Sequence, residues 1–351
     1  MAETLLILSG LYLAWSLGAN DAGNIISTAV GSRTISYRKA IWFFIVCLGI
    51  GAIFFSEEVI KTVSSGIVPS EVIGMREASI ALFVSAVWVH FATWKAWPVS
   101  ISQSVVSAVL GIGIVEGLRA GANVIFWKKV MILSGIWLFS PVIGFLIGMV
   151  LFKVVHGFVR HRHLYFRDVL HDLFKDPVHT VEEMVSGELR KREKVFKVIL
   201  LLSAGYMALA LGASTVAATT GLLWSGFAGK EVSFDLFSVL NWAVLIAVIL
   251  GIVTFGKRLV DFLGSRLVKL NALRGGIIQF ATASIILGCA MFGYPVSSTG
   301  VFVGCFLGVD SGEDHPKMKK HAIHNLLMAF LVTIPVVAGI SGLALLLCGY
   351  Q

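Results

Sequence analysis

Ten apolar segments, most of them long enough to cross a lipid bilayer, constrain the fold of this chain more than any other feature. A transmembrane helix needs about 20 predominantly apolar residues. Hydrophobic residues make up 57% of the chain and charged residues 14%, whereas soluble domains contain about 25% charged residues. The sequence therefore predicts an all-α integral membrane protein with crossings at residues 3–31, 39–55, 77–94, 97–118, 128–155, 195–230, 236–253, 273–293, 294–309 and 321–348.

Lysine and arginine residues fall mostly on one side of these predicted crossings. With the N-terminus outside, 20 of them, Lys95 included, lie in inner loops and six lie in outer loops. Cytoplasmic loops carry an excess of these residues, so we expect a multi-pass protein of the cell membrane with both termini outside. The net charge of +8 then reflects the cytoplasmic face and not nucleic-acid binding. Arg190-Lys191-Arg192 is expected to meet anionic membrane lipid.

Several motifs occur twice, in the same order and at nearly constant separation. Gly18 and Gly212, each followed by Ala, are 194 residues apart, and Pro98 and Pro295, each followed by Val-Ser, are 197 apart. Two further pairs recur between and after these motifs: the prolines Pro141 and Pro335, and the amphipathic segments 59–68 and 259–268, which are too charged to cross as simple spans. The recurrence indicates an internal duplication.

Five crossings in each half place the second half upside down relative to the first, an architecture found in many secondary transporters. We predict two inverted-topology repeats, residues 1–155 and 195–351, with broken or re-entrant helices at the centre, joined by a charged cytoplasmic linker at 156–194. The linker contains five histidines, and His is a common metal ligand. A helical linker of mixed charge is the favoured interpretation over a metal site.

Asn20, Asp21 and Asn24 interrupt the first apolar segment. An ionisable residue within a membrane span is costly and marks an ion or proton path. Carboxylate and amide oxygens suit a small hard cation, so we predict a sodium site at Asp21; a proton carrier would need the carboxylate alone. Ser214 and Thr215 stand at the matching place in the second half. We expect a helix break at both places, and the alternative role for Asn20 and Asp21 is to cap a half-helix that begins near Ala22.

The two Pro-Val-Ser segments open small-residue apolar runs. Proline is favoured in the first turn of a helix, where free backbone N–H groups and the positive end of the helix dipole make a ready anion site. Two such helix starts would surround one small anion with neutral donors. The alternative is that the hydroxyls only cap or join helices. The predicted anion-binding residues are Ser100, Ser102, Gln103, Ser104, Ser297, Ser298 and Thr299.

Other classes of protein fit less well. The spans contain no Ser-His-Asp set, no His-Glu-x-x-His motif and no paired carboxylates, so an enzyme is not expected, and neither is a cofactor. A channel would need a continuous polar lining, whereas polar residues here cluster at two broken segments per half. Cys47, Cys289, Cys305 and Cys348 have no metal-ligand spacing and are expected to be small buried hydrophobes, and His90 is expected to be a packed core residue.

The stretch Gly18-Ala19-Asn20-Asp21-Ala22-Gly23-Asn24, the Pro-Val-Ser segments and the duplication together resemble the inorganic phosphate transporter family. The resemblance implies a sodium- or proton-coupled phosphate symporter that works by alternating access, with sulfate carriers among its members. It assigns Asn20, Asp21 and Asn24 to the cation side and the seven residues of the Pro-Val-Ser segments to the anion. The resemblance is also compatible with a homodimer.

Two departures from the family pattern bear on the substrate. Ser214-Thr215 replaces the second Asn-Asp of the family, so one cation site is expected to be weakened or missing. The Pro-Val-Ser segments continue as Ile-Ser-Gln and Ser-Thr-Gly, where the family usually has Thr-Thr-His. Phosphate near neutral pH keeps a proton and needs an acceptor, whereas sulfate needs donors only. Phosphate is narrowly favoured because it is the usual substrate of the family, and sulfate is the alternative.

Overall fold

The computed structural model describes residues 1–69, 71–95, 97, 99–173, 178–227, 234–261, 271–312 and 320–349, without the side chains of 159–192, 234–238 and 320–330. Within these ranges every regular element is helical. The elements are α1 Ala2–Gly31, α2 Tyr37–Phe54, α3 Glu57–Ser65, α4 Met75–Trp94, α5 Ile101–Ala120, α6 Trp127–Leu173, α7 Val178–Leu211, η1 Gly212–Val216, α8 Ala217–Ser225, α9 Phe234–Thr254, α10 Lys257–Asp261, α11 Ala272–Met291, α12 Ser298–Ser311 and α13 Lys320–Cys348.

Each of the ten predicted crossings corresponds to a helix or helix pair in this structure. Eight helices of the described chain are long and apolar enough to span a membrane, and the apolar parts of α9 and α12 are shorter. The segment predicted at 195–230 is built from the end of α7, the π-helical turn η1 and α8. The chain is therefore an all-helical, multi-pass membrane protein, as its apolar pattern predicts.

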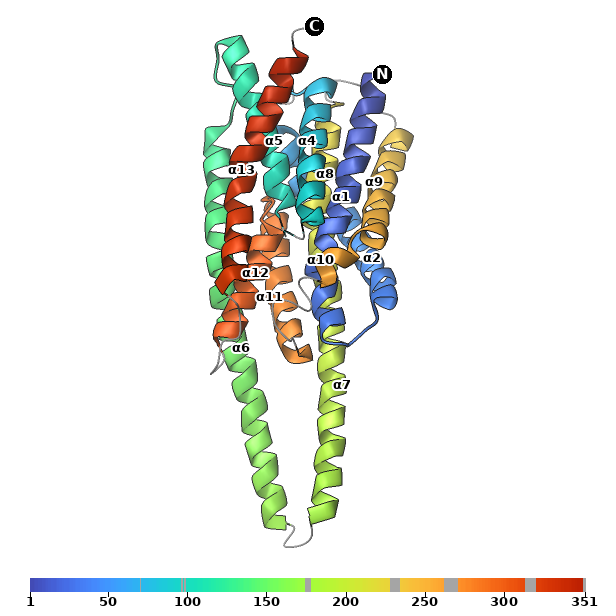
Figure 1. The fold of residues 1–351 in the computed structure, drawn as a ribbon, viewed down its shortest axis with the longest axis vertical. Helices are drawn as coiled ribbons and strands as arrows, with labels where there is room; N and C mark the ends of the chain where they lie inside the picture. The colour runs from blue at the N-terminus through green and yellow to red at the C-terminus, as the bar shows by residue number, and fades with distance from the viewer. Residues whose placement is uncertain are drawn as a thin grey trace.

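The four segments on either side of the Pro-Val-Ser motifs form two hairpins. In Figure 1, α4 and α5 occupy the half of the helical body that contains both chain ends, and α11 and α12 occupy the opposite half. Each hairpin returns to the end from which it came, and the two tips meet in the middle. This arrangement is typical of re-entrant hairpins, so the segments predicted at 77–94 and 273–293 are hairpin arms and not the full crossings that the sequence predicts. Because each hairpin removes two crossings, the predicted parity is unchanged.

The helices of the two halves pack in matching pairs. α1 packs on α4 and α9, and α7 packs on α11 and α2; α5 packs on α13, and α12 packs on α6. A Cβ at Gly51 would lie 1.9 Å from the carbonyl oxygen of Leu209, and a Cβ at Gly251 would lie 1.9 Å from that of Trp15. The two glycines are 200 residues apart (251 − 51) and the two carbonyls 194 apart (209 − 15). Glycine thus permits the same close helix approach in each half.

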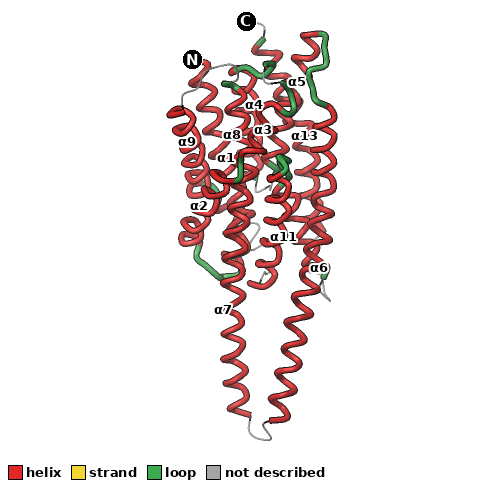
Figure 2. Tube along the Cα trace, turned by 180° about the vertical axis from the view of Figure 1, so that it is seen from behind, coloured by secondary structure: helices red, strands yellow, loops and turns green. Residues whose placement is uncertain are grey.

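The predicted linker is a helical extension of the membrane helices. α6 and α7 continue beyond the helical body as two long arms (Figures 1 and 2), so the predicted boundaries at 155 and 195 fall inside continuous helices. The side chains of His161, His163, His171 and His179, and of Arg190-Lys191-Arg192, lie outside the described residues. His156 stacks on Phe152, with ring centroids 5.2 Å apart.

The cysteines are free thiols, and one departs from the prediction. Cys305 is buried and Cys47 and Cys289 are partly buried, whereas Cys348 is exposed. Cys348 is the last residue of α13, where the helix leaves the packed body and no neighbour covers it. The prediction that all four are buried is therefore wrong for Cys348.

Candidate functional site

The three polar residues of the first half lie inside one unbroken helix. α1 runs from Ala2 to Gly31, so the predicted break near Asp21 is wrong, and so is the capping role for Asn20 and Asp21. Their small neighbours, Ala and Gly, leave the helical backbone free to continue while the polar side chains point into the protein. Asn20, Asp21 and Asn24 are at most 1% exposed. α1 therefore contributes side-chain oxygens to the interior but no freed backbone carbonyls.

The matching segment of the second half does depart from an α-helix. Gly212–Val216 forms the π-helical turn η1 between α7 and α8. Such turns widen the helix locally and occur frequently at functional sites. Ser214 and Thr215 lie within this turn, and both are fully buried. The helix is therefore distorted at the predicted place in this half, but it is not broken there.

Both Pro-Val-Ser segments lead into helix starts, as predicted. Ser100 caps α5 by accepting a hydrogen bond from the backbone N–H of Gln103 at 3.3 Å. Ser297 caps α12 by accepting one from the backbone N–H of Gly300 at 3.1 Å. The Ser104 hydroxyl donates to the carbonyl oxygen of Ser100 at 2.9 Å. The capping alternative thus holds for Ser100 and Ser297, while Ser102, Gln103, Ser298 and Thr299 sit buried in the first turns of the two helices.

Hydrogen bonds join the two helix starts to the polar face of α1. The Thr299 hydroxyl donates to the carbonyl oxygen of Val99 at 3.0 Å, which connects the first turn of α12 to the segment before α5. The Asn24 amide lies 3.3 Å from the Thr299 hydroxyl and 3.3 Å from a carboxylate oxygen of Asp21. The residues predicted for the cation and those predicted for the anion are therefore parts of one cluster.

The Asp21 carboxylate lies where three elements, α1, η1 and α12, meet. Besides Asn24 on its own helix, Thr215 of η1 and Ser298 of α12 are beside it. The Thr215 hydroxyl does not complete a hydrogen bond, however, and neither does the second carboxylate oxygen of Asp21. Asn20 donates from its amide to the Thr93 hydroxyl at the end of α4, at 2.9 Å. The carboxylate is thus surrounded by polar groups that leave part of its bonding capacity unused.

Unpartnered polar atoms gather in this cluster. Buried polar groups almost always have hydrogen-bond partners, and leaving one without a partner costs about 1–3 kcal/mol. The buried atoms without a partner in the described structure include two sets, oxygens suited to a cation and hydroxyl and amide atoms suited to an anion, and the hydroxyls of Ser16, Ser27 and Ser107 also have none. The first set is Asn20 Oδ1, Asp21 Oδ2, Asn24 Oδ1, Ser214 Oγ and Thr215 Oγ1, and the second is Ser102 Oγ, Gln103 Nε2 and Gln103 Oε1.

Gln279 of α11 belongs to the same cluster and was missed by the sequence prediction. Its amide donates to the carbonyl oxygens of Asn24 and Ile25, at 2.9 and 3.1 Å, and to the Thr28 hydroxyl at 2.7 Å. Its own Oε1 has no partner, and neither does the hydroxyl of nearby Thr282. The available signal was a lone amide in an apolar span, a weaker form of the signal that identified Asn20, Asp21 and Asn24.

Two basic groups considered from the sequence lie apart from the cluster's hydrogen bonds. Lys95 is exposed, and its ammonium lies 4.4 Å from the centroid of the Trp94 ring. His90 packs against Trp15 and Phe255, and its Nδ1 is 2.7 Å from the Tyr12 hydroxyl. His90 is therefore packed among aromatic rings as predicted, but it is partly buried and does not lie in the core.

A cavity of about 550 Å³ lies beside η1. It is bounded by α2 and α3 on one side and by η1, α8 and α9 on the other, and Ser56, Val216 and Thr220 are among its lining residues. The position that matches Ser56 in the other half, 200 residues on, is Gly256, where a Cβ would lie 2.6 Å from the Cβ of Ala22. The two halves therefore differ here: one contains a cavity and the other is closely packed.

Comparison with known proteins identifies the family to which this chain belongs. Residues 17–341 match the phosphate transporter family. The chain belongs to this family. A protein of Pyrococcus furiosus named as a phosphate permease is 28% identical over 96% of this chain and 94% of its own length. The chloroplastic inorganic phosphate transporter 2-1 of Arabidopsis thaliana is 24% identical over 95% of this chain and 70% of its own length.

A solved structure supports the fold described above. It is described as the sodium-dependent phosphate transporter, and it superposes with a TM-score of 0.84 at 25% sequence identity, covering 99% of both chains. This member of the phosphate transporter family is thus a multi-pass membrane transporter and not an enzyme, as the sequence predicts.

Proposed function

We propose that this protein is a sodium-coupled symporter that imports phosphate. The single observation that carries the proposal is the pair of unpartnered atom sets, one suited to a cation and one suited to an anion, in a single buried cluster. The sodium-dependent phosphate transporter whose fold this chain shares supports the choice of both ions. Asn20, Asp21, Asn24, Ser214 and Thr215 would hold sodium, and Ser102, Gln103, Ser298 and Thr299 would contact phosphate.

Coupling follows from placing the two ions side by side. The described cluster offers the anion hydroxyls, an amide and two helix starts, but no positive side chain. An anion held by neutral donors gains further stabilisation from a neighbouring cation, and the cation gains equally from the anion, because linkage between two sites is reciprocal. Each ion therefore binds better when the other is present, which is what a symporter requires.

We also propose that the two halves form inverted repeats that exchange conformations in alternating access. The matching helix contacts support the repeat, and so does the direction of the chain, because α1 runs away from the chain ends in Figure 1 while α7 runs toward them. The cavity beside Ser56 and the close contact at Gly256 would then be the open and closed forms of equivalent places. In the alternate state the first would close and the second would open.

Gly256→Ser tests this exchange. The new Cβ would lie 2.6 Å from that of Ala22, and overpacking of this kind costs about 1–3 kcal/mol. We expect the contact to loosen, the cavity beside Ser56 to close, and uptake to slow. The measurement is the rate at which a water-soluble maleimide labels Thr220→Cys, in a background where exposed Cys348 is replaced by Ser.

The expected result is slower labelling of Thr220→Cys in Gly256→Ser than in the parent. Ser56→Gly, which removes a side chain from the cavity itself, is the matched control and should leave the labelling rate nearly unchanged. Equal labelling in the parent and in Gly256→Ser would argue against an exchange between these two places.

The orientation is part of the same proposal. Both chain ends lie at one end of the molecule, opposite the α6 and α7 arms (Figure 1), as expected if the termini are outside and the arms are cytoplasmic. Lys95 lies at a hairpin tip and not in an inner loop, but its removal from the inner group leaves the charge bias in place. Dimer formation stays a prediction.

Gln103→Ala tests the anion side of the cluster. Both amide atoms of Gln103 are buried without a partner, so we expect them to bond the anion. Loss of such bonds costs about 1–3 kcal/mol, which corresponds to about a 5- to 150-fold weaker phosphate affinity. Sodium affinity measured without phosphate should be unchanged. Equal loss of both affinities would indicate general misfolding and not a role in anion binding.

The experiment that tests the proposed function is uptake of labelled phosphate and sulfate, in parallel, into proteoliposomes with sodium and proton gradients imposed separately. We expect saturable phosphate uptake driven by the sodium gradient. Sulfate uptake in place of phosphate would correct the substrate, and uptake driven by protons alone would correct the coupling ion. Flux that does not saturate and needs no cation gradient would identify a channel and overturn the proposal.

A further inference from the structure

We propose that Lys129 attracts the anion toward the first turn of α12 from the face of the molecule that contains both chain ends. This inference rests on the proposed function, since it assumes that an anion binds at that helix start. It supplies what the buried cluster lacks, a positive side chain that acts on an approaching anion before the anion reaches the neutral donors.

Lys129 lies beside the tip of the α11–α12 hairpin. Its ammonium is 5.7 Å from the centroid of the Tyr294 ring, and Tyr294 directly precedes the Pro-Val-Ser segment that caps α12. The indole N–H of Trp137, two turns further along α6, donates to the carbonyl oxygen of Pro295 at 2.9 Å. The same helix thus holds the hairpin tip and presents the lysine to it.

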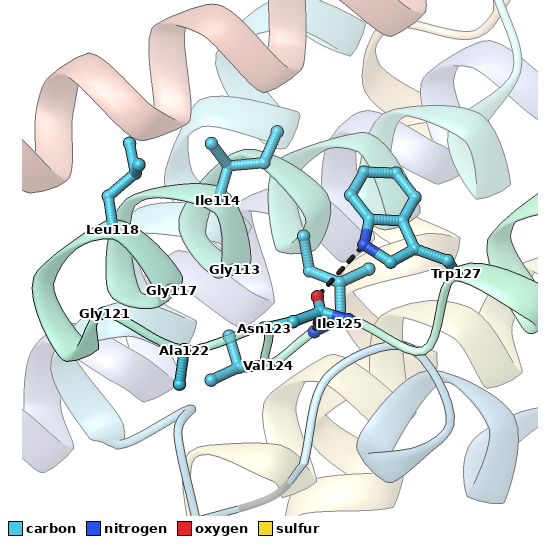
Figure 3. A pocket seen from close by; sticks show the side chains of 10 residues that line it. All are labelled: Gly113, Ile114, Gly117, Leu118, Gly121, Ala122, Asn123, Val124, Ile125 and Trp127. Atoms are coloured by element: carbon cyan, nitrogen blue, oxygen red, sulfur yellow. Dashed lines mark hydrogen bonds between the residues drawn. The ribbon is translucent and has the colours of Figure 1, made fainter.

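The start of α6 is fixed in place by the turn before it. The side-chain oxygen of Asn123 accepts hydrogen bonds from the backbone N–H of Ile125, at 3.2 Å, and from the indole N–H of Trp127, at 3.0 Å. Figure 3 shows Asn123 and Trp127 at the edge of a shallow pocket of about 350 Å³ at the end of α5. The backbone N–H of Phe126 donates to the carbonyl oxygen of Ile67 at 3.0 Å. Lys129, one turn later, therefore projects from a rigid base.

The positive charge of Lys129 is not neutralised by an ion pair within the described residues. The acidic helix α3 packs against this tip, because a Cβ at Gly293 would lie 2.9 Å from the carbonyl oxygen of Glu58. The carboxylates of Glu57 and Glu58 pair instead with Lys61, at 2.8 and 2.9 Å. Lys129 is half-buried, so its charge is screened by salt less than that of a fully exposed lysine.

The range of this charge suits attraction and not direct binding. Ser297, the cap of α12, follows Tyr294 by three residues, so the two Cα atoms are at most about 10 Å apart. The Debye length at physiological ionic strength is about 8 Å. The Lys129 ammonium lies a further 5.7 Å from the Tyr294 ring, so it acts on the anion through space, and a single charge there raises the association rate of the ion by at most about 10-fold. We therefore expect Lys129 to lower the KM for phosphate and to leave the maximal rate unchanged.

Lys129→Gln is the test, with Lys128→Gln as the matched control, since Lys128 is the exposed neighbour of Lys129 on the same turn. Sodium-driven phosphate uptake is measured in cells without other phosphate uptake, so that the anion is offered from the outer face alone. We expect Lys129→Gln to raise the KM for phosphate about threefold to 10-fold, with the maximal rate and the KM for sodium unchanged. Lys129→Arg should restore the parent KM.

Three outcomes would overturn this inference: equal KM values for Lys129→Gln and Lys128→Gln, a fall in the maximal rate without a change in KM, or a KM that Lys129→Arg does not restore. A merely structural lysine would produce the second. Failure of the proposed function is a separate result, because the parent protein itself would then show no sodium-driven phosphate uptake.

Discussion

Replacing Asp21 by Asn is expected to abolish sodium-driven phosphate uptake and to leave the protein folded. Asp21 is buried in α1, and one of its carboxylate oxygens has no partner. Two unit charges about 4 Å apart attract each other by about 4 kcal/mol at an effective dielectric constant of about 20, so loss of the charge corresponds to about a thousandfold loss of sodium affinity. Asn has the same shape and leaves the packing of α1 intact.

The measurement is labelled phosphate uptake into proteoliposomes with a sodium gradient, together with the thermal unfolding midpoint of the purified variant. Glu116→Gln is the matched control, because Glu116 is a carboxylate on α5 that pairs with Arg119 at 2.7 Å, away from the cluster. We expect this control to transport phosphate at the parent rate. Normal sodium-coupled uptake by Asp21→Asn would refute the assignment of Asp21 as the sodium ligand.

Gly18→Val is expected to prevent the protein from folding. A Cβ at Gly18 would lie 1.9 Å from the carbonyl oxygen of Val248 in α9, and the Val248 carbonyl carbon and Cα would be 2.8 and 3.0 Å away. Since all three atoms belong to backbone, no side-chain rotation relieves the overlap, and we expect a loss of more than about 3 kcal/mol of stability. Gly18 is also one helical turn before Asp21, so any shift of α1 would displace the carboxylate.

The measurement is the yield of monodisperse protein in detergent and its thermal unfolding midpoint. Gly339→Val is the matched control, because a Cβ at Gly339 on α13 meets nothing within 4 Å. We expect the control to be recovered at the parent yield. A Gly18→Val protein with the parent's midpoint would mean that α1 and α9 do not pack as described.

The helices and the helix starts were predictable because each has a local cause. Apolar length alone locates the ten segments, and the Pro-Val-Ser segments cap α5 and α12 through side-chain chemistry that acts within one turn. The length of a segment could not distinguish a crossing from a hairpin arm, since α4 and α5 have 20 residues each. In either arrangement the backbone hydrogen bonds are made within the helix. Their shared position in one half of the molecule results from packing between distant helices.

The two polar motifs show what the local sequence could not predict. Gly-Ala followed by two polar residues forms a continuous helix in α1 and a π-helical turn in η1. The local patterns are nearly the same, so the difference arises from the tertiary contacts of each segment. Gln279 could have been found as a lone amide in an apolar span, but its bonds to Asn24 and Ile25 join residues more than 250 positions apart, which no local pattern predicts.

The most direct test of the central claim, that one buried cluster holds sodium and phosphate side by side, is the dissociation constant of phosphate measured on the purified protein in sodium chloride and in choline chloride at equal ionic strength. We predict that sodium tightens phosphate binding about 5- to 150-fold, and that phosphate tightens sodium binding by the same factor. The same phosphate dissociation constant in both salts would contradict the claim.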